Sequence, residues 1–223
     1  MEMNTWQTAL LHIDIMHITV QLLRVTNVDE LFEALVAKGE AHADVQDERI
    51  PYWAELWPAA IALSEYLVQA GAIKATDRVT EIGCGLGLPG IIAGKLGATV
   101  TFTDYLEEPL QMAQRNWYLN HSGVAHFQRM DWRQPDTTLA ADVVLASDIT
   151  YEKRFLDHLP QAFRSLCRPK GQILVSDPER DVAQSFFENI EQAGFTKERF
   201  TFKIYPPWSG LPTAVSVYKL QCK

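Results

Sequence analysis

Residues 79–90 read Val79-Thr-Glu-Ile-Gly-Cys-Gly-Leu-Gly-Leu-Pro-Gly90, a short apolar run followed by four glycines within eight residues. The apolar run predicts a β-strand, and the residues after it predict a glycine-rich turn that opens a helix. Glycine allows positive φ angles and lets a ligand touch the backbone. Since N–H groups at a helix N-terminus bind anions and carboxylates, the segment predicts a ligand-binding turn in an α/β fold.

Two loop patterns compete for this turn. From residue 85 to 90 the glycines match the dinucleotide fingerprint, and Asp104 lies near the offset of about 20 residues expected for its ribose-binding acid. From Glu81 onward the spacing matches the loop of proteins that bind S-adenosylmethionine (SAM). The glycines of this second pattern are Gly83, Gly85 and Gly87. A carboxylate at 81 would repel a pyrophosphate but can face the ammonium group of SAM, so it favours the second pattern over the first. A tight turn without a ligand is the remaining alternative.

Strand-like and helix-like segments alternate from residue 78 to the end of the chain. The strand-like runs are 78–82, 99–104, 125–130, 142–146, 171–176, 199–205 and 214–221, and the helical segments are 89–96, 107–121, 155–167 and 182–193. This alternation predicts a doubly wound, mostly parallel seven-stranded sheet. Because no helix separates the last two strands, we expect them to pair antiparallel at one edge.

The chain before residue 51 is expected to be an N-terminal extension that caps a domain of residues 51–223. Its apolar run predicts a strand or hairpin over 10–25, its amphipathic run predicts a short helix over 28–37, and its charged stretch predicts a mobile loop over 40–49. A further helix is expected over 59–69, with Pro58 near its first turn.

Composition indicates a globular protein. Hydrophobic residues make up 47% and charged residues 22%, and 20 Lys and Arg against 28 Asp and Glu give a net charge of −8. The acidic balance removes the general attraction for nucleic acid. No apolar run approaches the length of about 18 residues that a membrane helix needs. We therefore expect neither a nucleic-acid partner nor a membrane span.

The N-terminus and the cysteines bear on localisation and on metal content. The start Met1-Glu-Met-Asn4 has no Lys or Arg, whereas a secretory signal begins with basic residues. The first Lys or Arg of the chain is Arg24. Cys84, Cys167 and Cys222 lie far apart, without a spacing suited to zinc or to a disulfide framework. We expect a cytoplasmic protein without a metal site, in which Cys84 is a small packing residue.

Acidic residues follow the second and third predicted strands. Asp104 ends the strand 99–104, where its carboxylate can accept both ribose hydroxyls of a nucleoside cofactor, or else cap the next helix. Asp131 and Trp132 follow the strand 125–130. There a carboxylate can accept from an adenine amino group and an indole can pack on its face, although a solvated loop acid is equally compatible.

Four segments carry a family resemblance. They are Pro51-Tyr-Trp-Ala-Glu-Leu-Trp-Pro-Ala-Ala60, Glu81-Ile-Gly-Cys-Gly-Leu-Gly-Leu-Pro-Gly90, Phe102-Thr-Asp-Tyr105 and Asp142-Val-Val-Leu-Ala-Ser-Asp-Ile-Thr-Tyr151. Over about residues 50–221 the chain resembles the class I SAM-dependent methyltransferases, and among them the seven-β-strand, family-16-type protein-lysine methyltransferases. The resemblance implies a Rossmann-like methyltransferase fold, SAM as cofactor and a protein lysine as methyl acceptor.

The narrowest part of the resemblance is Leu56-Trp57-Pro58 combined with Asp148-x-x-Tyr151. It implies that Trp57 lies against the methionine end of SAM and that Asp148 and Tyr151 line the substrate entrance. Ser147, just before Asp148, is included among the cofactor-binding candidates, whereas Trp53 is expected to pack. Without the resemblance, Asp148 would equally suit a helix N-cap and Tyr151 a core position.

Methyl transfer is an in-line displacement, so the residues mainly have to align an amine and exclude water. We expect Asp148 to position the amine first and to act as a base second. The Tyr151 ring can face an ammonium or methylammonium group, a contact of about 0.5–2 kcal/mol.

Other functions stay open from the sequence. Small-molecule methylation by the same pocket is one, and a non-catalytic SAM- or dinucleotide-binding module is another. The net charge of −8 suits a basic peptide and a cationic metabolite alike. The turn Ser176-Asp-Pro-Glu-Arg180 is compatible with an edge of the substrate mouth or with an ordinary turn.

Overall fold

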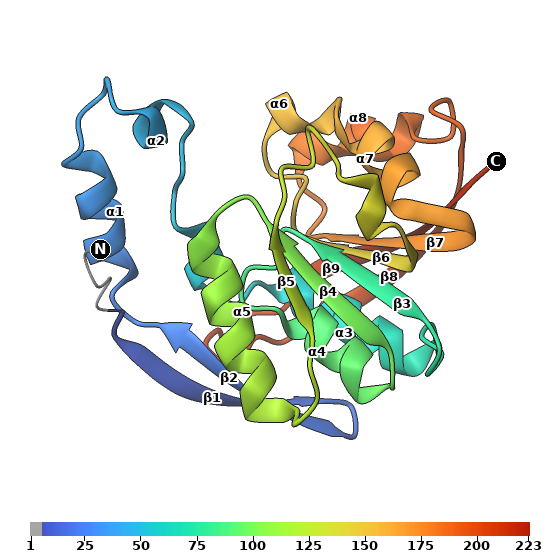
Figure 1. Cartoon of the computed structure of the whole chain (residues 1–223), viewed down its shortest axis with the longest axis horizontal. Coiled ribbons are helices and arrows are strands. Elements are labelled where there is room, and N and C mark those ends of the chain that lie inside the picture. Colours follow the sequence, from blue (N-terminus) through green and yellow to red (C-terminus); the bar gives the residue numbers. More distant parts are fainter. Residues whose placement is uncertain (1–5) are drawn as a thin grey trace.

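A seven-stranded sheet dominates the computed structural model, which describes residues 6–223 (Figure 1). Its strands are β3 (Arg78–Ile82), β4 (Thr99–Asp104), β5 (His126–Arg129), β6 (Ala141–Ser147), β7 (Cys167–Asp177), β8 (Phe195–Ile204) and β9 (Thr213–Cys222). They are ordered β5-β4-β3-β6-β7-β9-β8. The first five are parallel, and β9 runs antiparallel between β7 and β8. The predicted sheet and its antiparallel C-terminal pair are confirmed.

Helices cover both faces of this sheet. On one face lie α3 (Pro58–Gln69), α4 (Leu88–Lys95) and α5 (Glu107–Asn120), and on the other lie α6 (Lys153–Leu156), α7 (Leu159–Leu166) and α8 (Asp181–Asn189). Strand β6 shows why: Val143 and Leu145 join the first hydrophobic core, whereas Val144 and Ala146 join the second. A parallel strand buried on both faces is apolar throughout, as this one is.

Two predicted segments differ from the structure. The single helix expected over 155–167 is split into α6 and α7, because Pro160 lies in the first turn of α7, where a residue without an N–H group is tolerated. The expected loop over 40–49 contains a short helix, α2 (Ala43–Gln46), and Arg49 forms an ion pair with Asp44 at 2.5 Å. This segment is therefore more ordered than its composition predicts.

The N-terminal hairpin consists of β1 (Thr8–Ile15) and β2 (Ile18–Val25), as expected, and is followed by α1 (Val28–Val36). Two asparagines of α5 bond its backbone. Asn120 accepts from the Gln21 N–H at 3.0 Å and Asn116 accepts from the Leu23 N–H at 2.7 Å. Asn116 also donates to the Leu86 carbonyl at 3.0 Å, so one side chain connects the hairpin to the glycine-rich loop.

Residues 6–223 show neither a membrane-spanning helix nor a cluster of metal ligands. No helix there combines the length and the apolar character needed to cross a bilayer. No group of three or more His, Cys, Asp or Glu side chains in the same range is placed to hold a metal ion. The three cysteines are free, and the Met1–Asn4 start lies outside the described residues.

Candidate active site

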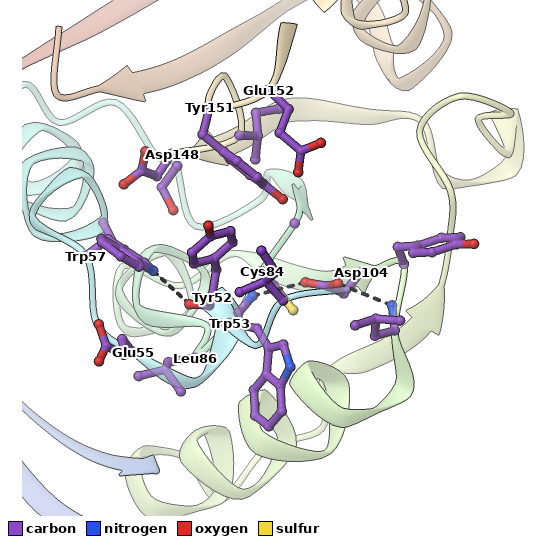
Figure 2. Close-up of a pocket in the computed structure, with 18 of the residues that line it drawn as sticks. Tyr52, Trp53, Glu55, Trp57, Cys84, Leu86, Asp104, Asp148, Tyr151 and Glu152 are labelled. Atoms are coloured by element: carbon purple, nitrogen blue, oxygen red, sulfur yellow. Dashed lines mark hydrogen bonds between the residues drawn. The ribbon is translucent and has the colours of Figure 1, made fainter. Parts of the chain in front are cut away.

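A cleft of about 1080 Å³, including its open mouth, lies at the carboxyl ends of the parallel strands (Figure 2). This is the edge where ligands collect in open α/β sheets. Ten of the eleven residues singled out from the sequence line it: Trp57, Gly83, Gly85, Gly87, Asp104, Asp131, Trp132, Ser147, Asp148 and Tyr151. The eleventh, Glu81, does not.

The glycine-loop end of the cleft consists of Gly83, Gly85, Gly87 and Asp104. Gly83, Gly85 and Gly87 have φ angles of 62°, 50° and 82°, in the left-handed region that glycine adopts without strain. A Cβ on Gly83 would also lie 2.9 Å from the Ile149 side chain and 3.1 Å from Trp132. The loop is therefore held in a backbone path that side chains would block.

Asp104 fixes this loop to the end of β4. Its carboxylate accepts hydrogen bonds from the Gly85 N–H at 3.2 Å and from the Leu106 N–H at 3.3 Å (Figure 2). Burial raises the pKa of Asp104 to about 6, although these backbone bonds oppose the shift. Helix α5 is capped by Leu106, so Asp104 is not its N-cap. The carboxylate borders the cleft, where it can accept from the hydroxyls of a ribose.

Glu81 lies beneath the loop instead of facing the cleft. It is fully buried, its Oε2 accepts from the Gly90 N–H at 3.0 Å, and its Oε1 has no partner. Burial raises the pKa of Glu81 to about 8, so the group is mostly neutral at pH 7. The observed contact ties β3 to the first turn of α4, in place of the direct contact with a cofactor ammonium that we expected.

Asp131 and Trp132, which follow β5, also line the cleft. Both oxygens of Asp131 accept from the Nε of Arg133 at 2.9 Å. Burial acts to raise the pKa of Asp131, but the hydrogen bonds from Arg133 outweigh it and the pKa is lowered. The Trp132 ring packs edge-to-face on Phe155, with ring centroids 5.9 Å apart, and its buried N–H has no partner. An ionised carboxylate and a fixed indole thus line the part of the cleft where we expect the adenine to bind.

The Asp148 end of the cleft consists of Tyr52, Trp57, Asp148 and Tyr151. Asp148 follows β6 with a φ of 58°, and its N–H donates to the Ser176 carbonyl at 2.9 Å. Its Oδ1 accepts from Arg180, whereas its Oδ2 is buried without a partner. Burial raises the pKa of Asp148, and the ion pair with Arg180 offsets part of that shift. Since α6 is capped by Glu152, Asp148 is not an N-cap.

Three aromatic rings stand beside this carboxylate (Figure 2). The Tyr52 ring lies between the other two, with its centroid 5.6 Å from Tyr151 and 6.2 Å from Trp57, both edge-to-face. The Trp57 N–H donates to the Tyr52 carbonyl at 2.8 Å, which fixes the indole at the cleft. Burial raises the pKa of Tyr151, so its hydroxyl keeps its proton. The arrangement offers ring faces to a cation and a hydroxyl donor.

Charge along the cleft is strongly negative. Its described lining carries seven carboxylates, from Asp47, Glu48, Glu55, Asp104, Asp131, Asp148 and Glu152, and two guanidinium groups, from Arg49 and Arg133. Clefts lined by one sign of charge concentrate ligands of the opposite sign. Both a sulfonium cofactor and an ammonium acceptor are cations, so the lining fits them.

Three further residues contribute to the cleft although their sequence positions do not indicate it. Tyr52 lies inside the quoted aromatic segment but was not assigned a role. Arg180 lies in the turn whose role was left open, and no local signal links it to Asp148. Arg49, which lines the cleft, donates to the Tyr105 hydroxyl at 3.0 Å. Trp53, expected to pack, does so against Trp6 at 5.4 Å but also lines the cleft.

Comparison with known proteins shows which family has a sequence like that of this chain. A family model described as lysine methyltransferase matches residues 45–193, more than half of the chain. The chain belongs to the lysine methyltransferase family. Membership confirms the resemblance seen in the sequence and implies S-adenosyl-L-methionine as the methyl donor. The residues fit this donor, because the positive-φ glycines, the Asp104 carboxylate and the Trp132 ring border one cleft.

Curated relatives of this chain align with it over part of their length. The chain is 31% identical over 160 residues to histone-arginine methyltransferase METTL23 of Rattus norvegicus, which covers 69% of this chain and 67% of that protein. It is 30% identical over 148 residues to EEF1A lysine methyltransferase 3 of Mus musculus, covering 64% and 63%. A Xenopus laevis METTL23 is matched over 52% of its length at 31% identity. The chain thus spans between about half and two thirds of these relatives.

Solved structures agree on the fold of this lysine methyltransferase family member. The ribosomal protein L11 methylase of Lactobacillus delbrueckii subsp. bulgaricus superposes with a TM-score of 0.56 at 20% identity, over 72% of this chain and 77% of that one. A protein of Pyrococcus horikoshii proposed to be an RNA methyltransferase gives a TM-score of 0.60 at 20% identity, over 89% and 97%. At this identity the likeness shows the Rossmann-like methyltransferase fold.

Proposed function

We propose that this chain is a SAM-dependent N-methyltransferase that methylates the Nζ of a lysine in a protein. The observation that carries the proposal is the Asp148 end, where a buried carboxylate with one unpartnered oxygen lies beside three aromatic rings and next to the glycine loop. The named acceptors of the relatives include lysine and arginine, so the family match alone does not choose the residue.

SAM supplies a methyl group on a sulfonium sulfur. Gly83, Gly85 and Asp104 would hold its nucleoside part, and Trp57 its methionine end. The protein side of the reaction is then alignment of an amine and exclusion of water. The neutral lysine nitrogen forms the new N–C bond as the C–S bond breaks, and the ammonium proton has passed to water beforehand.

Asp148 and Tyr151 have separate tasks in this proposal. The free Oδ2 of Asp148 accepts an N–H of the amine and thereby directs its lone pair. Tyr151, which keeps its phenolic proton, and Tyr52 present ring faces to the cationic product. Burial in this apolar mouth disfavours the ammonium form and so helps the lysine to lose its proton.

The test is to incubate the protein with methyl-labelled SAM and a cell extract, digest the proteins and locate the label by mass spectrometry. We expect label on a lysine side chain of a protein, and at least about 100-fold slower labelling with the Asp148→Asn variant. Label only in small metabolites would overturn the protein substrate. Label on arginine or histidine would overturn the lysine acceptor.

We also propose that residues before 51 act as a cap on the cleft and that the protein works in the cytoplasm. Asp47, Glu48 and Arg49 line the cleft, and Arg154 after β6 pairs with Glu48 at 3.3 Å, which supports the cap. The three free cysteines support a reducing compartment. Fluorescence microscopy of the tagged protein would test the compartment. Loss of SAM affinity on disrupting the pair between Arg154 and Glu48 would test the cap.

A further inference from the structure

Arg180 is the cation that contacts the proposed acceptor-binding carboxylate. It lies in the turn after β7, and its Nη1 donates to the Oδ1 of Asp148. Its own N–H donates to the Oδ1 of Asp177 at 2.9 Å, which fixes the turn. Only 6% of the Asp148 side chain is exposed, so this ion pair is largely shielded from water. The guanidinium is a permanent cation and therefore compensates the Asp148 charge at every pH of interest.

An uncompensated carboxylate would work against the reaction. A negative charge within about 4–6 Å of an amine favours its protonated form, by roughly one to three pKa units. The protonated amine has no lone pair for the methyl group. With Arg180 in place, Asp148 can still accept a hydrogen bond through Oδ2 while its charge is balanced through Oδ1.

We propose that Arg180 is a positioning residue that keeps the acceptor lysine neutral: it holds the Oδ1 and the charge of Asp148, so that Oδ2 receives an N–H of the incoming amine. This inference rests on the proposed function, and it names the group that lets an acidic site accept an amine in its neutral form.

The other groups around Asp148 make this role necessary. Asp177, at the end of β7, lies 3.9 Å from Arg180 and accepts from the Thr150 hydroxyl at 2.5 Å. Asp104 ends β4, and Tyr151 and Glu152 follow β6, while the Tyr52 hydroxyl belongs to the helical turn η1 (Tyr52–Ala54). The carboxylates among these neighbours each favour an ammonium. Arg154 donates to Glu152 at 2.5 Å and offsets the charge of that carboxylate, but it forms no ion pair with Asp148. Among the described residues, Arg180 is the cation in contact with Asp148.

The consequence is a specific kinetic signature. Without Arg180 the bound lysine keeps its proton to higher pH, so kcat at pH 7.5 falls about tenfold and recovers as the pH rises by about one to two units. KM does not rise, because an uncompensated Asp148 attracts the ammonium form more strongly. A purely structural role would instead lower kcat at every pH or raise KM.

The experiment measures kcat and KM between pH 6.5 and 10 for the wild type, Arg180→Gln and Arg180→Lys. The probe is the peptide around the lysine that the wild-type protein labels in extract. Arg199→Gln is the matched control, since Arg199 pairs with Glu179 in the same region without touching Asp148. We expect the rising limb of kcat to move up by about one unit or more in Arg180→Gln. Arg180→Lys and Arg199→Gln should stay near the wild type.

Calorimetry with S-adenosylhomocysteine identifies variants that have lost their fold. Arg180→Lys keeps the positive charge, so a rising limb of kcat shifted upward in folded Arg180→Lys would also overturn the inference. An unchanged pH profile in folded Arg180→Gln would overturn the inference while leaving lysine methylation intact. So would a rise in KM with kcat reduced equally at all pH values. If the wild type labels no lysine, the proposed function fails, and this inference fails with it.

Discussion

The glycine-loop end and the Asp148 end of the cleft are built in different ways. At the glycine-loop end, backbone N–H groups and Asp104 come from two strand ends that are neighbours in the sheet, β3 and β4. At the Asp148 end, side chains come from segments around residues 52, 148 and 180, and Asp148 itself has a left-handed backbone. Binding of the cofactor therefore depends on the ends of two neighbouring strands. Choice of the acceptor depends on side chains from segments that are far apart in the sequence.

The sharpest way to break this comparison is Asp148→Asn. Asparagine tolerates the left-handed backbone but carries no charge, so the fold should persist while kcat falls about 100-fold or more. The affinity for S-adenosylhomocysteine should stay within about twofold, since Asp148 lies at the other end. Label transfer and calorimetry measure the two quantities, with Asp14→Asn in the N-terminal hairpin as a control. Full turnover by Asp148→Asn would remove the acceptor assignment.

Asp104→Asn tests the glycine-loop end, where the affinity for the cofactor is the quantity expected to fall. Replacing a carboxylate that accepts ribose hydroxyls should cost about 2 kcal/mol of binding, or about 30-fold in the affinity for S-adenosylhomocysteine. Circular dichroism checks that the fold is kept, and Asp136→Asn, an exposed cap of a 3₁₀ turn, is the matched control. Affinity within twofold of the wild type would mean that Asp104 supports the loop without touching the ligand.

The pH dependence of cofactor affinity sharpens the same assignment. Asp104 has a pKa of about 6 in the free protein, and ribose hydroxyls donate to its ionised form. Affinity should therefore be complete above pH 6 and be lost as the pH falls through it, by about tenfold per unit below. Calorimetry between pH 5 and 8 measures this, and Asp104→Asn should give a flat profile. A flat profile in the wild type would count against the role.

Glu81→Gln has the smallest expected effect on activity, because Glu81 supports the glycine-rich loop and does not line the cleft. Glu81 has a pKa raised from 4.5 to about 8, so the folded state binds a proton that the unfolded state releases. The wild type must then lose stability as the pH rises from about 4.5 to about 8. Glu81→Gln lacks this dependence, so its free energy of unfolding should stay nearly constant between pH 5 and pH 8 while that of the wild type falls. Urea unfolding at pH 5 and pH 8 measures the free energy of unfolding of both proteins. If it changes equally with pH in the wild type and in Glu81→Gln, Glu81 is ionised in the folded protein.

The sequence predicts the glycine-loop end well for physical reasons. Strands 78–82 and 99–104 have the ends that the sequence predicts, because the apolar run stops at the glycines and at Asp104. Trp57, Asp148 and Tyr151 were found through the family resemblance, and all three line the cleft.

The rest depends on three-dimensional contacts. The turn Ser176–Arg180 looks like an ordinary turn, since nothing local shows that Arg180 reaches a side chain 32 residues away. Periodicity also failed where a proline splits α6 from α7. Glu81 was misplaced because the alternation of β3 turns it towards α4 and away from the cleft.

A crystal structure with bound S-adenosylhomocysteine tests the central claim most directly. We expect the ribose hydroxyls to lie within hydrogen-bond distance of Asp104 and the sulfur to face Asp148, Tyr151 and Trp57. A ribose away from Asp104, or a sulfur turned towards Asp131 and Trp132, would contradict it.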